Sequence, residues 1–197
     1  DRRHIQEEDV RRLRKIVTTT LNMELALNEE IINIALDIKP DEVCIVPERR
    51  AELTTEGGLD VLSQKKNISQ TIERFHKAGI RVSLFIDPEP DQIRAAAEVQ
   101  THIIELHTGK YAEAQGKEQD EEWQRLAEAA ELAHSLGLQV NAGHGLNYTN
   151  TARIVSIPSI HTLNIGHSIV ARAIFVGMEQ AVREMLSIIQ QGYPHAG

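Results

Sequence analysis

The chain has 197 residues, of which 41% are apolar and 25% charged, and its formal net charge is −8. These values are ordinary for one globular domain, and the acidic balance argues against the basic face that a nucleic-acid partner requires. No run reaches the roughly 18 apolar residues of a membrane span. The only cysteine, Cys44, has no partner for an intramolecular disulfide, so we expect a buried thiol and a cytoplasmic location.

The predicted elements alternate between short apolar strands and longer helical segments, as judged by the spacing of apolar residues and by helix-capping and helix-ending residues. Asn28 has the side chain of a helix cap, and Gly79 and Gly137 are suited to end helices. In chain order the pattern predicts a helix at 6–16, a strand at 18–25, a helix at 28–38, a strand at 42–46, a helix at 68–78, a strand at 81–86, a helix at 90–99, a strand at 102–106, a helix at 119–136, a strand at 139–141, a helix at 149–156, a strand at 162–165 and a helix at 168–190.

Strict alternation of strands and helices predicts an α/β fold with a parallel sheet. Length alone favours an open doubly wound sheet, because a (β/α)₈ TIM barrel usually needs about 250 residues. Two features favour the barrel instead. No strand is followed by a glycine-rich dinucleotide fingerprint, and polar residues end nearly every strand. We therefore expect one barrel domain over residues 1–197 that lacks its first strand–helix unit and second strand, with further chain upstream of Asp1.

Chemically capable side chains gather at the predicted strand ends. In a barrel these ends meet at one mouth, where carboxylates and imidazoles can exchange protons near neutral pH. The residues are Glu24, Glu48, Asp87, Glu105 with His107, Asn141 with His144, and Asn164 with His167.

Glu24 is flanked by apolar residues in the segment 21–25, and burial there would raise its pKa and make it a competent base. The alternative is a solvent-facing glutamate. His144 stands between Gly143 and Gly145, which allow a ligand to approach the backbone closely. The alternative is an ordinary loop histidine.

The last predicted helix follows Gly166 and His167, and the free N–H groups at its start could hold a phosphate. Plain helix capping by Ser168 is the alternative. The polar segment 47–60, continuing to residue 67, is long enough for a lid with a hinge at Gly57–Gly58, or for a surface loop without a role. No local spacing typical of metal ligands is present, so we expect no metal site.

Several segments together resemble the pyridoxine 5′-phosphate synthase family. They fall in the family's order and cover essentially the whole chain. These segments are 1–5, 54–60, 83–87, 105–109, 140–148 and 163–167.

The resemblance implies a TIM barrel in a cytosolic, octameric enzyme that needs no cofactor. The enzyme condenses 1-deoxy-D-xylulose 5-phosphate with 3-amino-2-oxopropyl phosphate and releases pyridoxine 5′-phosphate, phosphate and water. It implies that Glu24 is the general base and His144 the proton donor. It further implies two sets of substrate contacts: His4 and Thr54 to the deoxyxylulose phosphate, and Gly145, Gly166 and His167 to the aminoketone phosphate.

Two other functions remain open from the residues alone. A metal-dependent sugar isomerase or epimerase could use the same glutamate and histidines as ligands. A non-catalytic protein could bind one sugar phosphate and convert nothing. The family also carries a catalytic histidine and a first strand with Asn and Asp ligands ahead of the Asp1–His4 motif, and neither is in this chain.

Overall fold

A computed structural model describes residues 5–47 and 57–192. Its six strands form one parallel sheet in the sequential order β1-β2-β3-β4-β5-β6. The strands are β1 (Asn22–Ala26), β2 (Glu42–Val46), β3 (Arg81–Ile86), β4 (Ile103–His107), β5 (Gln139–Gly143) and β6 (Ile160–Asn164).

Sequential order distinguishes the two folds that the sequence left open. A doubly wound sheet reverses its strand order at a switch point, whereas a barrel adds each strand beside the last. The observed order has no reversal, which confirms the barrel-type prediction. Within the described residues β1 and β6 are the sheet edges, so the strands form an open arc.

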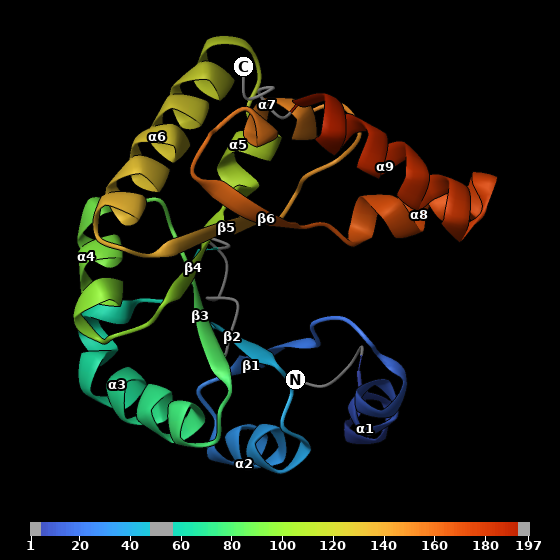
Figure 1. Ribbon diagram of the computed structural model, residues 1–197. Coiled ribbons are helices and arrows are strands. Elements are labelled where there is room, and N and C mark those ends of the chain that lie inside the picture. The colour runs from blue at the N-terminus through green and yellow to red at the C-terminus, as the bar shows by residue number, and fades with distance from the viewer. Residues whose placement is uncertain (1–4, 48–56, 193–197) are drawn as a thin grey trace.

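Helices cover the outer side of this arc and its two ends (Figure 1). Figure 1 shows α2, α3, α4 and α6 along the outside of the sheet, α1 near the β1 end, and α8 and α9 near the β6 end. Within the described residues none of the helices is long and apolar enough to cross a membrane. The helices are α1 (Glu7–Ile16), α2 (Glu29–Ile38), α3 (Val61–Lys77), α4 (Pro90–Glu98), α5 (Gly109–Glu113), α6 (Gly116–Ser135), α7 (Thr151–Val155), α8 (His167–Val176) and α9 (Met178–Gly192).

Alternation along each strand gives the sheet two chemically different faces. Val43, Ile45, Val82 and Leu84 belong to the hydrophobic core, which also contains the buried helix residues Ile68, Ile72 and Phe75. Burying each such side chain contributes about 1.5–3 kcal/mol. The residues between them face inward, and several of these are polar. Along this inner face Glu24 pairs in register with Cys44, and Cys44 with Ser83. Further along the sheet Phe85 pairs with Glu105, and Glu105 with Asn141. The helices therefore hold the sheet from outside and leave its inner face available for a site.

Several predicted elements differ from those in the structure. The first strand spans Asn22–Ala26 rather than 18–25, so Glu24 lies in the middle of β1 rather than at its end. Helix α3 begins at Val61, because Asp60 caps its first turn by accepting a hydrogen bond from Ser63 N, and residues 61–67 are not loop. The short helix α5 was not predicted. The expected helix 168–190 is two helices separated by Gly177, whose φ of 84° and ψ of 155° interrupt the helix.

Other local predictions were confirmed. The Asn28 side chain accepts hydrogen bonds from Glu30 N and Ile31 N and caps α2. Gly79 and Gly137, each two residues after the end of α3 and α6, adopt φ values of 76° and 80°. The Cys44 side chain is fully buried. These features depend on residues close together in the sequence, which is why the sequence predicts them.

Candidate active site

A cavity of about 1100 Å³ lies at the carboxyl ends of the strands. Five predicted site residues line it, and they come from β1, from the loop after β5 and from the start of α8. These are Glu24, His144, Gly145, Gly166 and His167. Four residues predicted only as strand-end candidates also line it: Asp87, Glu105, His107 and Asn164. The predicted contacts His4 and Thr54, and the candidate Glu48, lie outside the described residues.

Glu24 projects from the middle of β1 into the cavity and is exposed there. The expectation that apolar neighbours in the sequence would bury it is therefore wrong for this arc. Its neighbour Leu25 is buried in the core, because successive side chains on a strand point to opposite faces. Apolar residues next to Glu24 in the sequence thus do not surround its carboxylate.

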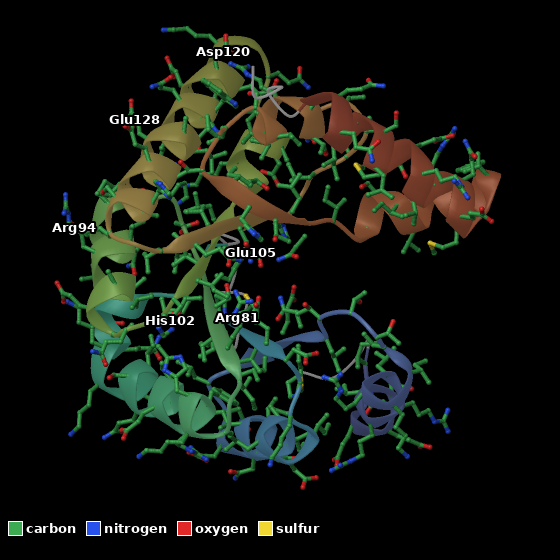
Figure 2. All side chains as sticks on the ribbon, in the orientation of Figure 1. Arg81, Arg94, His102, Glu105, Asp120 and Glu128 are labelled. Carbon is green, nitrogen blue, oxygen red and sulfur yellow. The ribbon has the colours of Figure 1, made fainter. Side chains whose placement is uncertain are left out.

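Glu105, on β4, has the burial that the sequence suggested for Glu24. Its side chain lies on the inner face of the sheet, opposite the outer helices that carry Arg94, Asp120 and Glu128 (Figure 2). Only 4% of its surface is exposed. The pKa of Glu105 is raised to about 7: burial is the main cause, a hydrogen bond from Asn164 opposes the rise, and the charge of the nearby Glu24 adds to it.

Two hydrogen bonds fix the Glu105 carboxyl. Asn164 Nδ2 donates to Glu105 Oε2 over 2.6 Å, and Cys44 Sγ donates to the same oxygen over 3.6 Å. A carboxyl group that titrates near neutral pH can both accept and return a proton. A glutamate inside the apolar strand 103–106 is the sequence signal that could have assigned it a catalytic role.

His144 is held by an uncommon backbone conformation at the end of β5. Its φ is 82° and that of Gly145 is 75°, both in the left-handed region. Thr108 fixes this turn, since its Oγ1 donates to the carbonyl oxygens of Gly143 over 2.7 Å and of His144 over 2.5 Å. A side chain at Gly145 would place its Cβ 2.6 Å from that of Ala112. The turn thereby presents the exposed His144 imidazole to the cavity.

His107, which is buried, and Asp87, which is partly exposed, form a pair beside His144. His107 Nδ1 lies 3.0 Å from Asp87 Oδ1. The His107 ring also contacts Phe85, with ring centroids 5.0 Å apart, and meets the His144 ring edge-on at 4.9 Å. Burial raises the pKa of Asp87, but hydrogen bonds from His107 and from the Gly58 backbone N–H outweigh it and lower the pKa overall.

The start of α8 forms another part of the cavity wall. Gly166 precedes the helix and His167 is its first residue. Ser168 does not cap it; its Oγ donates instead to Leu146 O over 2.8 Å and ties the helix start to the loop after β5. The first N–H groups of a helix have no carbonyl partner within it and favour anions. The geometry suits a phosphate group.

A protein metal site needs several ligating side chains around one point. The described residues contain no group of three or more His, Cys, Asp or Glu side chains placed to share one ion. Glu24, His107, His144 and His167 all line the cavity but do not meet in such a group. The expectation that no metal takes part stays a prediction.

Comparison with known proteins gives consistent matches over nearly the whole chain. A family model described as "Pyridoxal phosphate biosynthesis protein PdxJ" matches residues 1–191. The chain is 53% identical over 192 residues to a pyridoxine 5′-phosphate synthase of Akkermansia muciniphila, covering 97% of this chain and 78% of that protein. It is 55% identical over 190 residues to the protein of the same name from Thermosynechococcus vestitus, covering 96% and 80%.

A solved structure supports the fold. The crystal structure of a xylose isomerase domain protein from Planctomyces limnophilus superposes with a TM-score of 0.53 at 13% identity, covering 86% of this chain and 71% of that one. At that identity the likeness concerns only the arrangement of strands and helices. Family membership rests on the sequence matches, and the chain belongs to the PdxJ family of pyridoxal phosphate biosynthesis proteins.

Proposed function

We propose that this protein is a pyridoxine 5′-phosphate synthase, as its relatives are named. It condenses 1-deoxy-D-xylulose 5-phosphate with 3-amino-2-oxopropyl phosphate and releases pyridoxine 5′-phosphate, inorganic phosphate and water. One observation supports the proposal beyond the names of the relatives: a single cavity joins three carboxyl groups, three imidazoles and a helix start suited to phosphate.

The reaction requires repeated proton transfers. An amine must add to a ketone, water and phosphate must leave, and the ring must close and lose protons to become aromatic. Glu24, an exposed carboxylate in the cavity, is the proposed general base that removes protons from the substrate carbon skeleton. His144 is the proposed donor that protonates leaving oxygen atoms.

Glu105 extends this acid–base set. Its pKa of about 7 leaves both protonation states populated at neutral pH. Glu105 therefore supplies a proton at one step and takes one up at another without a large energetic cost. The sequence patterns single out Glu105 only as a strand-end candidate, and the acid–base role is proposed here in addition.

Both substrates carry a phosphate, so the site needs two anion contacts. Gly145, Gly166 and His167 line one side of the cavity, where the start of α8 offers backbone N–H groups to the aminoketone phosphate. His4 and Thr54 are the proposed contacts to the deoxyxylulose phosphate. We further propose a single barrel domain in a cytoplasmic homo-oligomer, an octamer, that needs no metal or organic cofactor.

The deciding experiment measures formation of pyridoxine 5′-phosphate from the two substrates by the full-length protein, with and without a chelator. The proposal expects equal rates in both conditions. A rate that falls with chelator and returns with a divalent metal points to a metal-dependent isomerase or epimerase. Binding of one sugar phosphate by calorimetry, with no product, identifies a binding protein instead.

A further inference from the structure

We propose that Asp87 and His107 are positioning residues that hold the His144 imidazole in the orientation its proton transfer needs. The inference rests on the proposed function, because it assumes that His144 is the proton donor. It assigns a task to two side chains that the proposed reaction does not otherwise use.

The first contact orients His107. Because the pKa of Asp87 is lowered, its carboxyl group is ionised at neutral pH and can only accept hydrogen bonds. The 3.0 Å contact from His107 Nδ1 to Asp87 Oδ1 therefore requires a proton on Nδ1. A hydrogen-bonded carboxylate thus selects one tautomer of His107 and fixes the plane of its ring.

The second contact passes this orientation to His144. The two imidazoles meet edge to face, with ring centroids 4.9 Å apart and an interplanar angle of 67°. Phe85 packs on the His107 ring at 5.0 Å. The absence of a side chain at Gly109 leaves space for both imidazole rings, since a Cβ there would lie 2.6 Å from His107 Nε2 and 3.2 Å from His144 Cδ2. The His107 ring therefore cannot rotate freely, and the His144 ring packs against a ring whose position is fixed.

The backbone of His144 is held by a residue at the carboxyl end of β4, where His107 also lies. Thr108, the residue after His107, donates from Oγ1 to the His144 carbonyl over 2.5 Å. Consecutive residues thus fix the main chain and the side chain of the proposed donor. A left-handed φ of 82° is unfavourable for a residue with a side chain. Its presence at His144 therefore indicates that the surrounding contacts determine this conformation.

Asp87 is itself anchored on its other side. The Gly58 backbone N–H donates to its carboxylate, and Leu59 N donates to Phe85 O over 2.7 Å. Gly58 lies against the Ile86–Asp87 backbone so closely that any side chain there would overlap it. The contacts run from Gly58 through Asp87 and His107 to His144.

The test compares steady-state kinetics of wild type, His107→Phe and Asp87→Ala. Phenylalanine keeps a ring between Phe85 and Gly109 but cannot donate to Asp87. We expect kcat to fall about 10- to 100-fold in both variants while both KM values stay within about twofold, since small misplacements of reacting groups cost rates of this order. His134→Phe, the same change on the exposed end of α6, is the control.

A double-mutant cycle separates positioning from general damage. If His107 acts through His144, His107→Phe slows the wild type but does not slow His144→Gln further. A fall of the same size in both backgrounds, or an unchanged kcat in His107→Phe, overturns the inference. Because His107 is buried, thermal unfolding checks the fold of each variant. If His107→Phe does not fold, Asp87→Ala replaces it in the double-mutant cycle, because the Asp87 side chain is partly exposed.

Failure of the proposed function looks different. In that case the wild type forms no pyridoxine 5′-phosphate, or His144→Gln forms it at the wild-type rate, and the inference falls with it. Nitrogen-15 NMR of the histidines gives a readout apart from activity. In the wild type we expect the proton on His107 Nδ1 to resonate at low field, and we expect this signal to disappear in Asp87→Ala. An unchanged spectrum in Asp87→Ala contradicts the hydrogen bond between His107 and Asp87.

Discussion

Asn164 and Glu105 join β6 to β4 across the inner face of the sheet, with Asn164 Nδ2 donating to Glu105 Oε2 over 2.6 Å. The strand between them, β5, contributes Gly143 at this level, and a side chain there would collide with the carboxyl group. Three strands therefore shape the position of one buried carboxyl. Burial at that position carries an energetic cost when the carboxyl group is ionised.

Glu105→Gln should stabilise the fold above pH 7. Burial raises the pKa of Glu105 from 4.5 to about 7, so the folded state favours the protonated carboxyl. Its contribution to stability is fully present below pH 4.5 and is lost as the pH rises through 7, a loss of about 3 kcal/mol. Glutamine stays neutral, so its free energy of unfolding should match wild type in acid and exceed it in base. Urea unfolding across this range measures the difference, and a difference independent of pH contradicts the prediction.

Glu24→Gln should remove activity without affecting the fold. Loss of a general base lowers kcat by about 10²- to 10⁴-fold. Glu24 is exposed, so the free energy of unfolding should change by less than about 0.5 kcal/mol. Glu131→Gln on the exposed face of α6 is the matched control. Calorimetry should find phosphate-ligand binding nearly intact, and normal product formation by Glu24→Gln would falsify the assigned role.

Gly143→Ala should displace Glu105. The new Cβ would overlap Glu105 Oε1 and lie 3.0 Å from Asn164 O, which we expect to cost about 1–3 kcal/mol and most of the activity. Gly79→Ala is the control, because its Cβ meets no atom within 4 Å although its φ is 76°. That control should lose about 1 kcal/mol of stability and keep its kcat. Equal kcat values in both variants would show that Glu105 has room to move.

Gly177→Ala tests the break between α8 and α9. Its φ of 84° is unfavourable for alanine, and no atom lies within 4 Å of the added Cβ, so backbone strain is the only expected cost. We expect a loss of about 1–3 kcal/mol in thermal unfolding. Met178→Ala, one residue later in α9 and 54% exposed in wild type, should change stability little. Equal stability of the two variants would show that the helices can join.

The tertiary structure changed the assignment of the carboxyl groups. From the sequence, Glu24 and Glu105 look alike, since each stands among apolar residues of a short strand. In the structure Glu24 is exposed in the cavity, whereas Glu105 is buried beside Asn164 and Cys44. Sequence neighbours on a strand point to opposite faces, so they say little about what surrounds a given side chain.

The sequence by itself determined the alternation of strands and helices, the helix cap at Asn28 and the glycines that end α3 and α6. These features depend on propensities and spacing within a few residues. Only the tertiary structure decided the raised pKa of Glu105, the Asp87–His107–His144 contacts and the exposure of Glu24. Those properties depend on contacts between residues far apart in the chain, such as Asp87 with His107, 20 residues apart, and Glu105 with Asn164, 59 residues apart, which local patterns do not encode.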